Sequence, residues 1–204
     1  MVKDASFINF CNNLKNSTRE PIAIYVDSND SIIQADGIAV FKGEKYVGYL
    51  NAIDTISHLF ITNAVKNCYI TLDEPNIIDL EIKKYKNSRI KIFLIDNTPL
   101  ISIEIFPEAN ILYSETNFNY TEESNIEEIE NALNISLKNS LTNYLYKISR
   151  EYNSDIVSFK KIYRSTFLTN DDFSKIDWET IFNNSYFSIK VSSRILYSNI
   201  IRKE

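Results

Sequence analysis

Few side chains in this chain of 204 residues could carry out acid–base, nucleophilic or metal chemistry. His58, the single histidine, follows Ser57 in a stretch with helical spacing, where its imidazole could be a general base or a hydrogen-bonded structural residue. No Ser or Cys near it lies in a recognised nucleophile motif. Cys11 and Cys68 form no Cys-x-x-Cys pair, so one histidine and two separate thiols exclude an ordinary zinc site.

The two cysteines leave one alternative open. Cys11 and Cys68 can form a disulfide, or they can remain two buried free thiols, which is the more usual outcome for two isolated cysteines. The sequence alone does not decide between them.

Three pairs of adjacent acidic residues are the remaining candidates for catalysis, since two carboxylates can divide the general acid and general base roles. These pairs are Glu122-Glu123, Glu127-Glu128 and Asp171-Asp172. Each lies near the start of an expected helix, where solvated acids interact favourably with the helix dipole. We therefore predict no enzyme, no cofactor and no metal site, and a hydrolase built on His58 or an acidic pair is a third hypothesis.

Composition excludes two further classes of function. The formal net charge is −5 and the isoelectric point is about 5.1, whereas a nucleic-acid-binding domain has a basic face. The chain contains no run of 18 apolar residues, so we expect that it does not itself span a membrane. A hydrophobic fraction of 44% is enough for a substantial core.

The three glycines fall within twelve positions, at Gly37, Gly43 and Gly48. Residues 38–41 and 46–50 are β-branched and aromatic runs, which predict two strands of a hairpin with Gly43 in the turn. Gly48 inside the second strand indicates a bulge or a close backbone approach. The glycines fit either a plain hairpin with packing glycines or a loop that holds a ligand.

Apolar spacing predicts the other elements. Steps of three and four predict helices over residues 4–16, 53–64, 126–152, 155–164 and 171–183. Asn51 is the expected N-cap of the second helix, and Asp155 that of the fourth. Alternation predicts strands over residues 22–26, 68–72, 78–83, 90–95, 101–105 and 187–195, and Phe93 and Ile95 suggest that the fourth is buried on both faces.

These elements predict an α+β fold. Period-two patterning with polar outer residues favours a largely antiparallel β-sheet, with the long helix and shorter helices packed on one face. Trp178 and Phe182 are four apart on one helix face, which favours core packing and leaves an interface anchor as the alternative.

Three blocks of the sequence resemble the Ger(x)C family, the C subunits of bacterial spore germinant receptors. In the hairpin, the matching positions are Gly37, Ala39, Val40, Phe41, Lys42, Lys45, Gly48 and Leu50. The second block is Tyr152-Asn-Ser-Asp-Ile156, with Asp155 as its motif residue, and the third is Asp177-Trp-Glu-Thr-Ile-Phe182, with Trp178 and Phe182. We interpret these motif residues as structural.

The chain departs from the family pattern in its glycines. Family members usually place glycines just after the Asp-Ile pair, where this chain has Ser158 and Lys160. A further glycine near the end of the last strand is replaced by Ser198 or Asn199. Turn geometry is therefore expected to differ at these positions.

The resemblance implies a division of the chain and a cellular role. Residues 35–204 resemble the GerAC-like C-terminal domain, and residues 1–34 would be the end of a preceding region packed on it. The family's proteins are non-enzymatic lipoproteins, held on the outer face of the inner spore membrane by an N-terminal lipid anchor that is absent from this chain. Their partners are the membrane-embedded A and B subunits of the same receptor.

Two hypotheses follow from the resemblance. The first is a receptor subunit that mediates protein–protein contacts in nutrient-triggered germination, with an exposed apolar patch at Tyr144–Tyr146 or at Tyr163–Phe173. The alternative is a domain that binds the nutrient germinant, in a pocket of about 300 to 1,000 Å³ lined by Tyr and Phe.

Overall fold

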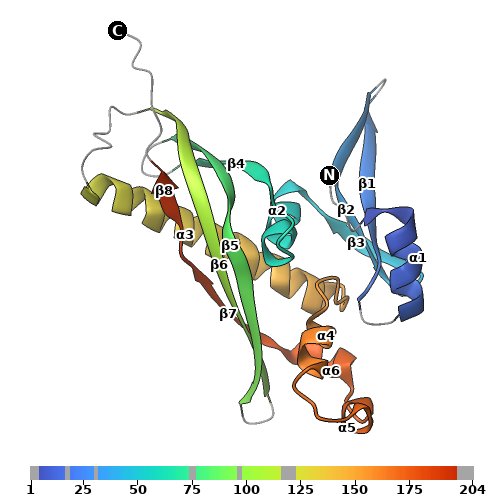
Figure 1. The fold of residues 1–204 in the computed structure, drawn as a ribbon. Helices are drawn as coiled ribbons and strands as arrows, with labels where there is room; N and C mark the ends of the chain where they lie inside the picture. The colour runs from blue at the N-terminus through green and yellow to red at the C-terminus, as the bar shows by residue number, and fades with distance from the viewer. Residues whose placement is uncertain are drawn as a thin grey trace.

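Two β-sheets and a set of helices make up the protein (Figure 1). The structure is a computed structural model, and it describes residues 5–16, 19–29, 32–73, 77–95, 98–115 and 123–196. Ser198, Asn199 and Glu122 lie outside these residues. The mixture of helix with two sheets that are mostly antiparallel confirms the predicted α+β class.

The smaller sheet is an antiparallel meander of three strands. In order, these are β1 (Ile22–Asn29), β2 (Ile32–Lys42) and β3 (Lys45–Leu50). The hairpin prediction is confirmed: β2 and β3 pair directly, and Gly43 has φ of 58° in the turn between them. The proposed boundary at residues 34 and 35 falls inside β2, and this division of the chain stays a prediction.

The larger sheet has five strands. They are β4 (Asn67–Leu72), β5 (Ile78–Ile95), β6 (Thr98–Ser114), β7 (Tyr186–Val191) and β8 (Arg194–Leu196). The order is β4-β5-β6-β7, and β8 also pairs with β6. The pairings of β7 and β8 with β6 are parallel, because a long helical segment returns the chain to the starting end of β6.

Strand β5 is longer than the sequence pattern predicts. It runs without interruption through residues 84–89, which separate the two strands predicted at 78–83 and 90–95. Register shifts between Lys84 and Lys86 and between Lys86 and Arg89 break the period-two alternation, so the pattern hides the continuity of the strand.

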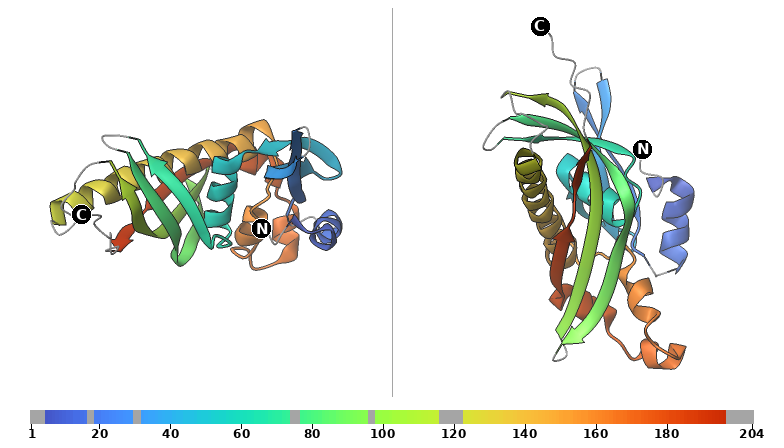
Figure 2. Two further views of the ribbon diagram at one scale, coloured as in Figure 1. Left: turned by 90° about the horizontal axis from the view of Figure 1, so that it is seen from above. Right: turned by 60° about the vertical axis from the view of Figure 1, so that its left-hand side comes forward.

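Six α-helices and one π-helical turn complete the described residues. They are α1 (Phe7–Asn16), α2 (Ala52–Ile61), α3 (Glu123–Tyr146), η2 (Lys147–Glu151), α4 (Phe159–Arg164), α5 (Asn170–Ser174) and α6 (Trp178–Asn184). As predicted, Asn51 caps α2 and accepts a hydrogen bond from the amide of Asp54. Helix α3 extends along most of the molecule (Figure 2, left).

Helix α3 contributes a stripe of buried side chains to the core: Ile129, Leu133, Leu137, Leu141, Tyr144 and Leu145. The same core contains Ile101, Ile103 and Ile105 of β6, which define the inner face of the larger sheet. Phe187 of β7 lies on this face and contacts Tyr146 and Phe159 edge-on or tilted. Helices α3 and α4 therefore share one face of the sheet.

Three helix predictions are wrong in detail. The long α-helix ends at Tyr146 and continues as a π-helical turn, Lys147–Glu151, in which each turn of the backbone is wider than in an α-helix. The predicted helix 171–183 is two helices, because Asp177 caps a new start at Trp178. Helix α4 begins at Phe159, four residues later than predicted, and Ser158 occupies its N-cap position.

Ser158 has a left-handed backbone conformation, with φ of 75°, and its side chain makes no capping hydrogen bond. This conformation costs a residue with a β-carbon about 1–2 kcal/mol relative to glycine. Glycine offsets part of this gain, because its unfolded state has more conformational entropy to lose on folding. We expect Ser158→Gly to raise the free energy of unfolding by about 1 kcal/mol, measured by urea denaturation. Ser158→Ala keeps the β-carbon and should not stabilise; a loss of stability in the glycine variant would contradict the strain.

Candidate functional site

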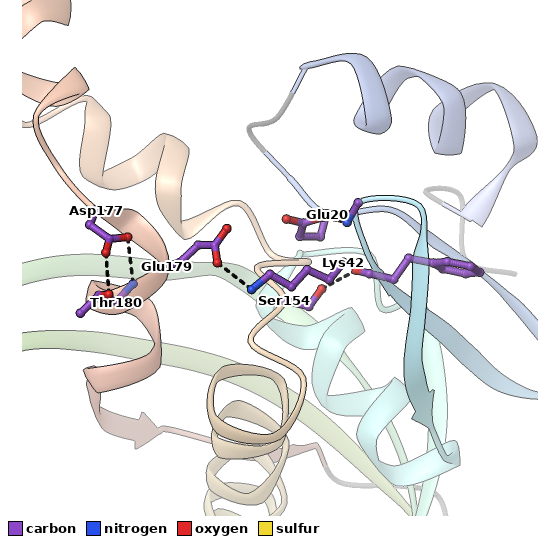
Figure 3. A network of polar contacts seen from close by, with 8 residues as sticks. Glu20, Lys42, Ser154, Asp177, Glu179 and Thr180 are labelled. Carbon is purple, nitrogen blue, oxygen red and sulfur yellow. Dashed lines mark hydrogen bonds and ion pairs between the residues drawn. The ribbon is translucent and has the colours of Figure 1, made fainter.

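The three sequence blocks that are far apart in the chain meet at one junction (Figure 3). The end of the β2–β3 hairpin contacts the turn that follows η2, and it also contacts the start of α6. We call this region the motif junction; it comprises residues 41–49, 152–156 and 177–182. The sequence indicated the blocks singly and gave no signal that they touch.

Two hydrogen bonds join the turn to the hairpin. The hydroxyl of Ser154, which is fully buried, donates to the carbonyl oxygen of Phe41 at 2.6 Å. The hydroxyl of Tyr152 donates to the carbonyl oxygen of Tyr49 at 2.9 Å. The two bonds reach opposite strands of the hairpin, so the turn fixes both β2 and β3.

Gly48 is required because Tyr152 lies against it. A β-carbon at residue 48 would come within 2.5 Å of the Tyr152 ring. At Gly37, a β-carbon would lie 1.9 Å from the carbonyl oxygen of Leu50. Both glycines therefore permit close packing, and the space over Gly48 holds a side chain of the protein itself.

An ion pair and a backbone contact complete the junction. The ammonium of Lys42 lies 2.7 Å from the carboxylate of Glu179 on α6. Both side chains are partly exposed, so this pair contributes little to stability. Glu20, ahead of β1, accepts a hydrogen bond from the amide of Gly43 at 2.7 Å, which holds the hairpin turn (Figure 3).

Asp155, in the turn that follows η2, carries a buried carboxylate within the motif junction. Its two oxygens accept hydrogen bonds from the amides of Phe159 at 3.0 Å and Lys160 at 2.7 Å. Burial raises the pKa of Asp155 to about 6, and the backbone donors oppose that shift. Asp155 thus satisfies the first amides of α4 from three residues before the N-cap position, which corrects its predicted place.

Trp178 and Phe182 pack in an aromatic cluster with Tyr163. The rings of Trp178 and Phe182 stack with centroids 5.9 Å apart, and Tyr163 lies 5.6 Å from Trp178. All three side chains are buried. Neither the Trp178 indole nitrogen nor the Tyr163 hydroxyl has a hydrogen-bond partner among the described residues.

The remaining motif residues divide by burial. Ala39, Val40 and Leu50 are buried in the core, while Lys45 is exposed at the hairpin end. They support the shape of the hairpin, and none of the four brings a reactive group to a cavity.

His58 is fully buried and engaged at both ring nitrogens. Its Nδ1 lies 2.8 Å from the hydroxyl of Tyr144, and Nη2 of Arg19 lies 3.4 Å from its Nε2. Since a guanidinium can only donate, Nε2 accepts and Nδ1 carries the proton. Burial raises the pKa of Tyr144 well above its ordinary value, so its hydroxyl stays protonated.

The other candidates for chemistry are dispersed. Glu127, Glu128, Asp171 and Asp172 are exposed at helix starts. Among residues 5–196 as far as the structure describes them, no group of three or more metal-ligating side chains comes together.

The cysteine alternative is resolved. Cys11 and Cys68 are both free, and Cys68 is the buried one, whereas Cys11 is half-buried. Burial raises the pKa of the Cys68 thiol to about 11, so it is unreactive at neutral pH.

A polar cleft lies beside the motif junction, between α2 and the end of α3. Its volume is about 730 Å³, and it is lined by Asn51, Asp54, Asn143, Tyr146, Lys147 and Arg150, among others. Lys147 and Asp54 form an ion pair of 2.7 Å within it. Sequence reasoning missed the cleft, because its side chains look like ordinary solvated helix residues.

Comparison with known proteins identifies the domain. The family profile "Spore germination B3/ GerAC like, C-terminal" matches residues 36–199, a range that contains all three blocks of the motif junction. The chain belongs to this family. The resemblance seen in the sequence is therefore confirmed.

The GerAC-like fold is also found in a solved structure. The crystal structure of the GerBC protein matches with a TM-score of 0.82 and 20% sequence identity. The match covers 96% of this chain and 62% of that chain, so this chain spans about three-fifths of the length of GerBC. No curated protein sequence matches the chain. No helix in the described parts of this GerAC-like chain is both long and apolar enough to cross a bilayer.

The packing of Tyr152 on Gly48 can be tested by a double-mutant cycle. Gly48→Ala should lower the free energy of unfolding by about 1–3 kcal/mol, because the methyl group displaces the Tyr152 ring and breaks its bond to Tyr49. In a Tyr152→Ala background, the same change should cost clearly less. Equal costs in both backgrounds would contradict the contact.

Proposed function

We propose that this protein is the C subunit of a spore germinant receptor and acts through contacts with other subunits, without catalysis. The observation that carries the proposal is the family match over residues 36–199, which includes every block of the motif junction. The likeness to GerBC supports the fold on which this role would rest.

The proposed partners are the membrane-embedded A and B subunits of the same receptor. The proposed location is the outer face of the inner spore membrane, where an N-terminal lipid anchor would make the protein a lipoprotein. A subunit of this kind needs a well-ordered scaffold, and the bonds of the motif junction contribute to one by joining the smaller sheet to the turn after η2 and to α6.

The predicted contact patches need revision. Tyr144 is fully buried, so the Tyr144–Tyr146 flank is not an exposed patch. In the second region Tyr163 is buried, while Leu168 between α4 and α5 is fully exposed. Leu168 is therefore the best candidate for a partner contact there.

The experiment starts from spores that lack the gene. We expect dipicolinate release to be lost for at least one nutrient and retained for a non-nutrient trigger. Wild-type chain should restore release and co-purify with the A and B subunits. Leu168→Glu should weaken both, because a charge would face the apolar contact, whereas Ile135→Glu, at an exposed position on α3, should restore release fully.

Two results would contradict the receptor role. The first is unchanged release for every nutrient, combined with failure to complement a known receptor mutant. The second is restored release without any association with A and B subunits, which would remove the proposed contacts.

A second candidate function is binding of the nutrient germinant itself, favoured by the polar cleft between α2 and α3. Its volume of about 730 Å³ suits a small molecule, but its lining is polar and charged where Tyr and Phe were predicted. A ligand here would carry both charges or several hydroxyl groups, to match Asp54, Lys147 and Arg150.

Titration of the ¹⁵N-labelled chain with amino acids, sugars and nucleosides tests this candidate. Saturable amide shifts confined to residues around the cleft, and lost in Asn143→Leu, would support it. Shifts that are absent, or unchanged by Asn143→Leu, would exclude the cleft as a germinant site.

A further inference from the structure

The far end of the β5–β6 hairpin carries exposed apolar side chains where the sequence predicts burial. Phe93, Leu94 and Ile95 are 46%, 52% and 54% exposed. Phe93 pairs with Leu100 of β6, which pairs in turn with Tyr186 of β7, itself 57% exposed. The prediction that this strand is buried on both faces is therefore wrong.

These residues form a continuous row on the outer face of the sheet. The inner face is fixed by the buried Ile101 and Ile103, so Leu100 between β5 and β7 points outward with its neighbours Phe93 and Tyr186. Ile95 lies two residues beyond Phe93 on β5, on the same face and nearer the hairpin end. Together these side chains make an apolar strip across three strands.

Basic residues lie directly behind the apolar strip. On the same outer face, the next row away from the hairpin end is Lys91, Ser102 and Ser188, and the row after it is Arg89, Glu104 and Lys190. Arg89 and Glu104 form an exposed ion pair of 3.7 Å. These two rows hold three cations and one acid, although the whole chain has a net charge of −5.

The apolar surface continues around the hairpin end. Leu94 lies on the same, inner face of β5 as Ile90 and Ile92, which pack against the core. Its side chain is nevertheless half exposed. Figure 1 and the right panel of Figure 2 place this end of the hairpin at the extremity away from β4 and β8. Exposed apolar side chains therefore lie on both faces of this hairpin end.

The opposite end of the same sheet offers a contrast. Tyr69 is 66% exposed and pairs with Glu81, and Tyr113 is 54% exposed and pairs with Asp79. Aromatic residues there alternate with carboxylates, which anionic lipid would repel. Of these two ends, as far as the structure describes them, the Phe93 end is the one that combines an apolar strip with adjacent cations.

We propose that this end of the sheet contacts the interface of an anionic lipid bilayer. Phe93, Ile95 and Tyr186 would lie at the boundary of headgroups and acyl chains, and Lys91 and Lys190 would bind lipid phosphates. Charged side chains such as Lys91 and Lys190 would be costly in hydrocarbon, so the contact is shallow and lies in the interface.

The test uses the purified full chain and two kinds of vesicle. The chain should co-sediment with vesicles of phosphatidylglycerol and phosphatidylcholine in equal parts, and weakly with pure phosphatidylcholine. Phe93→Ser combined with Ile95→Ser should weaken binding about tenfold or more through loss of buried apolar area. Lys91→Gln combined with Lys190→Gln should weaken it about fivefold per charge at low salt.

Matched controls separate contact from misfolding. Tyr69→Ser combined with Tyr113→Ser removes two large side chains that are at least as exposed from the other end of the sheet, and this variant should bind vesicles like wild type. Phe93→Trp should keep binding, and brominated lipid should quench the added fluorescence above the level of the wild-type Trp178. All variants are expected to unfold within a few degrees of wild type.

Three results would overturn the proposal. They are no binding of wild type to anionic vesicles, equal losses from the two pairs of apolar substitutions, or binding without quenching of the added Trp. Absence of vesicle binding with retained capture of a receptor subunit would assign the strip to a protein partner. Vesicle binding needs no partner subunit, so this test stands apart from the germination experiment.

Discussion

The packing of the turn after η2 against the β2–β3 hairpin is the constraint on which much of the structure depends. The Ser154 hydroxyl is bonded to Phe41, the Tyr152 ring lies on Gly48, and its hydroxyl is bonded to Tyr49. These contacts need a chain that leaves the long helix sharply and comes close to a backbone without a side chain. The π-helical turn and the glycine meet the two needs.

The same turn positions the elements that follow. Asp155 accepts bonds from the first amides of α4, and α4 with α6 covers the sheet through Phe159 and Phe182. Movement of the hairpin would therefore disturb α4 and α6 as well. The motif junction thus couples the hairpin, the turn after η2, α4 and α6 through direct contacts.

Much of the fold could be predicted from the sequence, because periodicity reports burial of one face. The apolar spacing predicted the long helix α3, and the sequence also predicted the N-cap at Asn51 and the turn at Gly43; the structure contains all three. Periodicity failed at residues 84–89, where bulges shift the register of β5, and at Phe93 and Ile95, where apolar residues are exposed. An apolar run has the same pattern whether it meets a core or another molecule.

The site was less predictable than the fold. The three motif blocks were visible, yet their convergence depends on tertiary packing that no local pattern encodes. Tyr152 could not be linked to Gly48, about a hundred residues away, without the structure. The polar cleft was hidden for a similar reason, since Lys147 and Asp54 come from two helices whose polar faces look solvated.

Hydrogen–deuterium exchange of Ser154→Ala against wild type tests the central claim most directly. The account predicts that amides of residues 38–50 and 152–160 lose protection together, while those of the first half of α3 do not. Ser140→Ala, which removes a hydroxyl bonded within α3, should change neither segment. Unchanged protection of the hairpin in Ser154→Ala would contradict the claim that the motif junction holds the structure together.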